Sequence, residues 1–192
     1  MKKVKPIPYR RKRTGRTNYY KRLRMLSSGL PRIVIRISLN HVLLQLVEFG
    51  QEGDKVVSSV RSSELSKLGW KFSYNNIPAS YLTGLIFGKR IKDSVKGAIV
   101  DIGLSTSIKG SKIYAAVKGI VDAGVKINCS DEILPDEKRV NGSHIAQYGK
   151  SLKQNDEAYK KQFSGYIKNN VNPEEITKAF DEVKNKIMSA KK

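Results

Sequence analysis

Residues 32–61 read RIVIRISLNHVLLQLVEFGQEGDKVVSSVR, and this stretch decides the fold. Its first third alternates between apolar and other residues, which is the period of a β-strand with one buried face. A tight turn at Leu39-Asn40 and a Gly-containing turn at 50–54 interrupt the apolar pattern. The stretch therefore predicts a three-strand antiparallel meander, with strands at Arg32–Ser38, Val42–Phe49 and Lys55–Arg61.

The first of these strands has two unlike faces. Ile33, Ile35 and Ile37 share one face, whereas Arg32 and Arg36 lie on the other. Successive side chains of a strand point to opposite sides of the sheet. We therefore expect the isoleucine face to meet the core and the arginine face to form a basic surface.

The segments that follow the meander predict the rest of an α/β fold. Pro78 opens a helix that runs to about Lys92, 97–102 is a continuous apolar strand typical of one covered on both faces, and Ser111 caps another helix. This order predicts a mixed sheet, the meander plus one parallel strand, with packed helices. Gly84 and Gly88 share a helix face and indicate close packing against the sheet.

A second apolar stripe is expected on the helix that Ser111 opens. It comprises Ile113, Ala116, Val117, Ile120, Val121 and Gly124.

From Asp131 onward the chain is polar and helical. Its last helix is marked by Asn172 as cap, Pro173 in the first turn and one apolar stripe made of Ile176, Phe180, Val183 and Ile187. A stripe of this kind needs a surface to cover it. We predict three regions: a basic arm and first helix at 1–29, an α/β core at 30–130, and a helical extension at 131–192.

The positive charge is concentrated at the N-terminus. The net charge is +20, and residues 1–47 contribute +13 of it because they hold thirteen Lys or Arg and no acid before Glu48. A chain with this charge repels itself unless a polyanion neutralises it. Pro6 and Pro8 predict an extended arm over residues 1–16, which is either a solvated tail or a tail that becomes ordered on nucleic acid.

Thr17–Ser28 predicts an amphipathic helix with Thr17 as its N-cap and Gly29 just past its end. Tyr19, Leu23 and Leu26 share a face that we expect to dock on protein. Lys21 and Arg24 point away from that face and suit phosphate. The interleaved tyrosines can stack on unpaired bases, which favours RNA over duplex DNA.

Other classes of site have little support in the sequence. The single cysteine, Cys129, allows no internal disulfide and no cysteine-based zinc site, so we expect a reducing setting and no metal or cofactor. No secretory signal and no apolar run long enough for a bilayer are recognised, so we expect no membrane partner. The loop from Gly103 to Ser111 lacks a P-loop ending, but Lys109, Ser111 and Lys112 at a helix N-terminus suit a phosphate.

An RNA-processing nuclease is one alternative, because a meander followed by helix and strand also opens the ribonuclease H fold. Two-metal cleavage needs clustered carboxylates. Asp101 ends the fourth strand alone, which favours a loop hydrogen-bond acceptor. A general basic nucleic-acid-binding protein is the other alternative, and it rests on charge alone.

Several segments together resemble the archaeal and eukaryotic family of large-subunit ribosomal protein eighteen (eukaryotic protein five). They cover most of the chain, least well beyond Lys153, and Asn18, Asn141 and Ser143 depart from the family's usual residues. The segments are Arg16–Gly29, Asn76–Gly84, Asp101–Leu104, Gly110–Lys112, and Ile133–Pro135 followed by Arg139 and Gly142–Ala146.

The resemblance implies a structural, non-enzymatic component of the large subunit in the cytoplasmic ribosome, with a ribonuclease-H-like translational-machinery fold. It implies binding of 5S rRNA and its attachment to 23S rRNA in the central protuberance, beside neighbouring large-subunit ribosomal proteins. Together with the charge and stacking arguments, it makes the following residues candidates for RNA binding: Arg10, Arg11, Lys12, Arg13, Arg16, Thr17, Tyr19, Tyr20, Arg22, Arg24, Arg32, Arg36, Lys109, Ser111 and Lys112.

Overall fold

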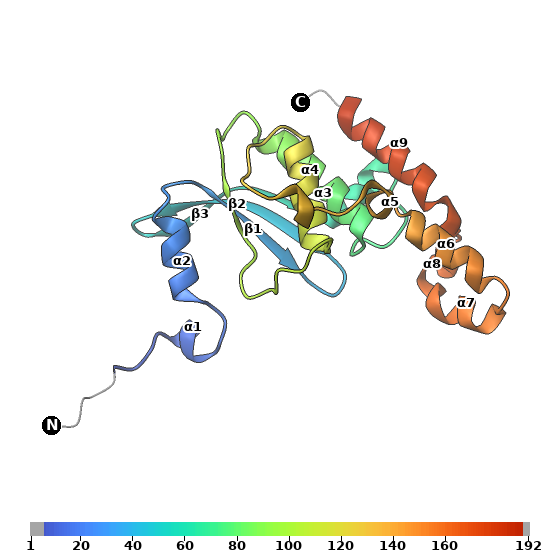
Figure 1. Cartoon of the computed structure of the whole chain (residues 1–192), viewed down its shortest axis with the longest axis horizontal. Coiled ribbons are helices and arrows are strands. Elements are labelled where there is room, and N and C mark those ends of the chain that lie inside the picture. The colour runs from blue at the N-terminus through green and yellow to red at the C-terminus, as the bar shows by residue number, and fades with distance from the viewer. Residues whose placement is uncertain (1–5, 190–192) are drawn as a thin grey trace.

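The computed structural model describes residues 6–189 and is built around one four-stranded mixed sheet (Figure 1). The strand order is β3-β2-β1-β4. The strands are β1 (Arg32–Ile37), β2 (Val42–Gly50), β3 (Gly53–Arg61) and β4 (Ile99–Asp101). The first three form the predicted antiparallel meander, and β4 pairs with β1 in parallel, as predicted.

Strand β4 differs from the prediction in its length and in the burial of its side chains. It spans three residues rather than six, and Ile99 and Val100 are only half-buried. The strand order explains this, because β4 lies at an edge of the sheet with β1 as its one neighbour. The apolar run therefore does not mark a strand covered on both faces.

Helices α3 (Ile77–Ile91) and α4 (Lys112–Asp122) cover the isoleucine face of β1. Ile33 and Ile35 are fully buried there, as predicted, together with Phe87 of α3 and Ile120 of α4. Helix α3 begins where expected because the side chain of Asn76 accepts a hydrogen bond from the Ala79 backbone N–H at 2.8 Å.

The two glycines of α3 serve a different contact from the one predicted. A Cβ on Gly84 would lie 2.1 Å from the carbonyl oxygen of Ala116, and a Cβ on Gly88 would lie 2.5 Å from the Cβ of Ala123. Both partners belong to α4 or its end, so close packing occurs between the helices and not against the sheet. On α4 itself, Val121 is only half-buried and Gly124 is exposed, so the predicted stripe ends at Ile120.

The chain after α4 is mostly helical. The short helices are η2 (Asp131–Ile133), α5 (Glu137–Val140), α6 (Ser143–Leu152), α7 (Asp156–Gln162), α8 (Ser164–Lys168) and η3 (Pro173–Glu175). They lead to α9 (Ile176–Ser189), whose predicted stripe is buried throughout. No helix within residues 6–189 is long and apolar enough to cross a membrane.

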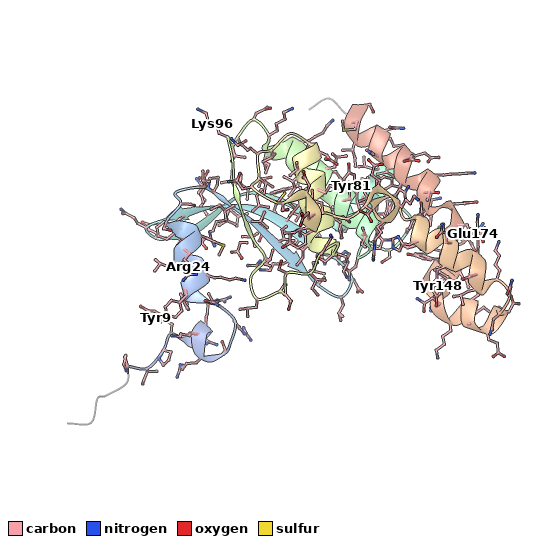
Figure 2. All side chains as sticks on the ribbon, viewed as in Figure 1. Tyr9, Arg24, Tyr81, Lys96, Tyr148 and Glu174 are labelled. Atoms are coloured by element: carbon pink, nitrogen blue, oxygen red, sulfur yellow. The ribbon has the colours of Figure 1, made fainter. Side chains whose placement is uncertain are left out.

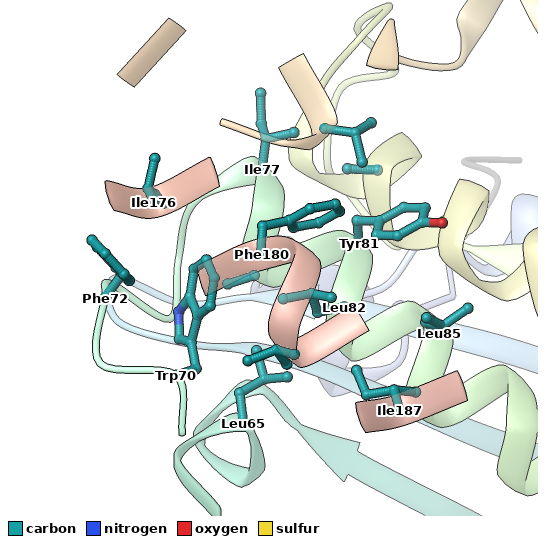
Figure 3. Close-up of a cluster of buried hydrophobic side chains, with 14 of the residues drawn as sticks. Leu65, Trp70, Phe72, Ile77, Tyr81, Leu82, Leu85, Ile176, Phe180 and Ile187 are labelled. Atoms are coloured by element: carbon teal, nitrogen blue, oxygen red, sulfur yellow. The ribbon is translucent and has the colours of Figure 1, made fainter. Parts of the chain in front are cut away.

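The surface that α9 covers belongs to the same chain. Phe180 of α9 lies beside Tyr81 of α3, and the cluster continues to Trp70, which follows the 3₁₀ helix η1 (Ser62–Leu68) (Figure 3). Trp70 and Phe72 also contact each other, with ring centroids 5.2 Å apart. The extension thus completes a second core cluster on the side of α3 away from the sheet. The division of the chain at residues 29 and 130 stays a prediction.

Two short helices, α1 (Arg10–Arg13) and α2 (Tyr19–Leu26), precede the sheet. They project from one end of the molecule, while α6, α7 and α8 lie at the other end (Figure 1).

Candidate nucleic-acid interface

The arm contains one helical turn where the sequence predicts an extended segment. Residues 10–13 form α1, and none of them is buried. The prolines at 6 and 8 restrict only the residues before Tyr9, so they leave the chain from Arg10 onward free to turn. Residues 1–5 of the predicted arm lie outside the described part of the chain. Figure 2 labels Tyr9, beside this segment at the margin of the molecule, and Arg24 on α2.

The cap of α2 is Asn18 and not Thr17. The Asn18 side chain accepts a hydrogen bond from the Lys21 backbone N–H at 3.1 Å. Thr17 instead accepts one from Nε of Arg11 at 2.8 Å. Both residue types favour helix N-termini, so composition alone does not decide between them. The Thr17 contact folds α1 back towards α2.

The protein-facing side of α2 also differs from the prediction. Leu23 is largely exposed, and no residue of α2 is buried. Arg22 and Met25 instead line a groove beside the sheet, which is described below. Tyr19 packs on Tyr9 of the arm, with ring centroids 5.3 Å apart. The tyrosine predicted to dock on the body of the protein therefore stabilises the arm.

A groove of about 740 Å³ lies between the arm, α2 and the arginine face of the sheet. Its cationic lining comes from three parts of the chain: Arg11 and Arg16 before α2, Lys21 and Arg22 within α2, and Arg32 and Arg36 on β1. The structure thus brings the arm and the strand face together, although Arg36 lies ten residues beyond the end of α2 in the sequence. Lys12 lies over the exposed ring of Tyr20, 5.6 Å from its centroid.

A chain of alternating charges crosses this groove. Arg22 donates to Asp54 at 3.0 Å, and Arg32 donates to the other oxygen of Asp54 at 2.7 Å. Arg32 also reaches Asp101 at 3.2 Å, and Arg36 reaches the second oxygen of Asp101 at 3.2 Å. Three arginines from α2 and β1 are therefore held by two carboxylates.

The two arginines of β1 have different surroundings. Arg32 is 3% exposed, and two of its guanidinium nitrogens are taken up by Asp54 and Asp101. The guanidinium of Arg32 thus serves contacts within the protein, and its contact with RNA stays a prediction. The Arg36 side chain is 45% exposed and remains open to a ligand.

Asp101 acts as the loop hydrogen-bond acceptor that the sequence favours. Besides the two arginines, its carboxylate accepts from the backbone N–H of Gly103 at 2.8 Å. The carboxylate of Asp101, on which the nuclease alternative depends, is thus already paired with Arg32 and Arg36. Within residues 6–189 there is no group of three or more His, Cys, Asp or Glu that could hold a metal ion.

The candidate phosphate loop lies apart from the charge chain. Lys112 donates to the Asn75 side chain at 2.9 Å, and Asn75 donates in turn to the carbonyls of Ser38 and Leu39. These carbonyls belong to the β1–β2 turn, at the opposite end of β1 from Arg32. Lys109 is exposed, while Ser111 stands at the N-cap of α4 without a side-chain capping bond.

Asp54 is the site residue that sequence reasoning missed. An acid in a hairpin turn normally indicates a solvated turn, and a charge count treats it as repulsive to RNA. Its role depends on Arg22 and Arg32, which lie 32 and 22 residues away. The close sequence neighbourhood of Asp54 holds no sign of either contact.

The remaining chemically active groups lie outside the groove. His41 stacks on Tyr74 with centroids 5.7 Å apart, and Cys129 is a half-buried free thiol. Burial, and then the charge of Asp131, raise the pKa of Cys129 above its ordinary value. A raised pKa favours the protonated thiol over the nucleophilic thiolate.

Two comparisons relate this chain to known ribosomal proteins. A family model described as "Ribosomal large subunit proteins 60S L5, and 50S L18" matches residues 3–98. The large ribosomal subunit protein uL18 of Methanococcus maripaludis is 46% identical over 184 residues, which is 95% of this chain and 95% of that protein. The similarity therefore includes the arm, the sheet and the helical extension.

Proposed function

The chain belongs to the family of large-subunit ribosomal proteins 60S L5 and 50S L18, and from this premise we propose that it binds 5S rRNA and helps to attach it to 23S rRNA in the central protuberance. Family membership makes it a ribosomal protein of the large subunit, with its place in the cytoplasmic ribosome. The proposed role is structural, not enzymatic. Its partners would be the two RNAs and the neighbouring proteins of the large subunit.

One observation carries the RNA-binding proposal: the N-terminal helices contain no fully buried residue and present cations. Neither α1 nor α2 contains a buried residue, and neither contains an acid. Short helices without tertiary packing are marginal in water. Phosphates that pair with Arg10, Arg11, Arg13 and Arg16 would both neutralise and order this segment, with release of counterions from the RNA.

The groove supports different roles for the candidate residues: phosphate contact, base stacking and support of the arm. We assign phosphate contacts to the exposed cations of the arm, with Lys12, Arg22, Arg24 and Arg36. Tyr20 is largely exposed and suits base stacking, worth about 1–3 kcal/mol by substitution at such sites. Tyr19 and Thr17 support the arm from within. Arg32 holds the network together.

The loop at Lys109, Ser111 and Lys112 is proposed as a second contact with RNA. Its distance along β1 from the groove supports a separate stretch of RNA, either in 5S or in 23S rRNA. The strand order β3-β2-β1-β4 supports the proposed ribonuclease-H-like form of the sheet.

Deletion of residues 1–29 tests the proposal. The full-length chain and the shortened chain are compared for retention of labelled 5S RNA in a filter-binding assay. Trp70, the single tryptophan, reports through its emission that the core remains folded. We expect binding to be abolished with the emission unchanged. Unchanged RNA binding would contradict the proposal.

A competition measurement separates this function from general binding of nucleic acid. Duplex DNA and unlabelled 5S RNA are each added to the complex at equal phosphate concentration. From a general basic nucleic-acid-binding protein, either competitor displaces the labelled RNA. We expect displacement by 5S RNA and retention against DNA.

A further inference from the structure

Asp54 is an acid in the lining of the groove that is proposed to bind a polyanion. Its side chain is 28% exposed and borders the groove. Taken alone, its charge would repel phosphate and lower the affinity for RNA. Its two oxygens, however, are each directed at a different arginine, Oδ1 at Arg22 and Oδ2 at Arg32.

The two arginines differ in how firmly they are held. Arg32 is buried within the sheet and is tied at its other guanidinium nitrogen to Asp101. Arg22 belongs to α2, which buries no residue. Asp54 thus joins an anchored cation to a cation on a projecting helix. The bond to Arg32 fixes the carboxylate, and the carboxylate in turn fixes the guanidinium of Arg22.

We propose that Asp54 is a positioning residue of the RNA interface: it holds Arg22, and with it α2 and the arm, in the orientation that meets RNA. This inference rests on the proposed function. Ordering a loose segment on binding costs affinity, so a contact that orders it beforehand raises affinity. Asp54 therefore favours RNA binding even though its charge opposes it.

The opposite sign of these two effects makes the inference testable. Asp54→Asn removes one negative charge and keeps the size of the side chain. Charge alone predicts tighter binding to 5S RNA. The positioning role predicts weaker binding by about 1.5- to 5-fold, the range expected for a partly exposed ion pair. Glu52→Gln is the matched control, because Glu52 is an exposed acid in the turn that leads into β3, two residues before Asp54, and it should leave binding unchanged or slightly tighter.

A double-mutant cycle separates positioning from general destabilisation. Arg22→Gln, Asp54→Asn and the double variant are compared for their dissociation constants with 5S RNA at one salt concentration, with Trp70 emission confirming folded protein. If Asp54 acts through Arg22, Asp54→Asn weakens binding in the original chain but not in the Arg22→Gln background. Asp54→Glu, which keeps the charge, should recover part of the affinity.

The outcomes distinguish this inference from the proposed function. Weakening that depends on Arg22 supports the inference. The inference is overturned if Asp54→Asn binds 5S RNA more tightly, or if it weakens binding equally in the original chain and in the Arg22→Gln variant. Neither result contradicts the proposed binding of 5S RNA. Absence of 5S RNA binding by the unaltered chain overturns the proposed function and this inference together.

Discussion

Gly84 of α3 and Ala116 of α4 bring the two helix backbones into direct contact. A Cβ on Gly84 would lie 2.1 Å from the carbonyl oxygen of Ala116, a separation that real Cβ atoms do not show. The contact is mutual, since a Cβ on Gly119 of α4 would lie 2.2 Å from the carbonyl oxygen of Tyr81. Both helices pack on the sheet, so this contact sets how tightly the core closes.

Gly84→Ala should therefore destabilise the fold. The added methyl group meets backbone, which cannot move aside as a flexible side chain can, so we expect the free energy of unfolding to fall by about 2 kcal/mol or more. Urea denaturation followed by Trp70 emission measures it. Gly165→Ala in α8 is the control, because nothing lies within 4 Å of its added Cβ. The control should be neutral or stabilising by up to about 1 kcal/mol, and equal losses in both variants would contradict the packing argument.

The salt dependence of RNA binding should report the arm. If about eight cations engage phosphates, the log–log slope of affinity against salt is about −7 for duplex RNA and about −6 for single strands. Replacing Arg10, Arg11 and Arg13 with Gln should lower its magnitude by about 2–3. The control replaces Lys160, Lys161 and Lys168, which carry the same total charge at the far end of the molecule. The same change in both sets would show that overall charge, not the arm, governs binding.

Helix α9 should contribute to stability as a core element. Phe180 is buried against Tyr81, with ring centroids 5.6 Å apart. Phe180→Ala leaves a cavity in the cluster that contains Trp70, so we expect a loss of about 3–4 kcal/mol in the free energy of unfolding. Met188 lies on the exposed side of the same helix, and Met188→Ala should change stability by less than about 0.5 kcal/mol. A neutral Phe180→Ala would mean that the extension is not part of the core.

His144 should make stability depend on pH. Burial, and then the positive charge of Arg139, lower the pKa of His144 below its ordinary value of 6.5, against a smaller opposite effect of a hydrogen bond with the Lys138 backbone. The unfolded chain therefore takes up this proton at a higher pH than the folded chain does. Stability contributed by neutral His144 is present above pH 6.5 and is lost as the pH falls towards the lowered pKa.

The measurement is the melting temperature at several pH values between about 7.5 and 5. The original chain should lose stability on acidification, and His144→Gln should lose less because it has no imidazole to protonate. Identical pH profiles for the two proteins would exclude His144 as the cause.

The parts of the fold that follow from local patterns were predictable. The alternation through Ile33, Ile35 and Ile37 correctly predicted the strand and its buried face, and the spacing of Ile176, Phe180, Val183 and Ile187 correctly predicted the buried stripe of α9. Each pattern repeats with the period of its own element, so it can be read without knowing the neighbour. What each stripe packs against was not predictable, and the partners of Gly84 and of α9 were found only in the structure.

The candidate site divides in the same way. Residues 10–24 were predictable as a basic segment because charge is a property of composition. The direction of α2 was not, since Tyr19 turned to Tyr9 and Leu23 stayed exposed. The spacing of Tyr19, Leu23 and Leu26 gives α2 one apolar face, but a helical period does not record which part of the molecule that face will meet.

The amino-acid sequence is enough to locate the positive charge, the meander and the main helices, and to show the family of the chain. What each charged side chain does depends on its tertiary contacts. Arg32 and Arg36 share a strand face and look equivalent in sequence, yet one is buried between Asp54 and Asp101 and the other is open to the groove. The physical reason is that an ion pair forms between groups close in space, and Arg32 and Asp101 are 69 residues apart in the chain. No local period records that pairing, so it arises only when β4 lies beside β1.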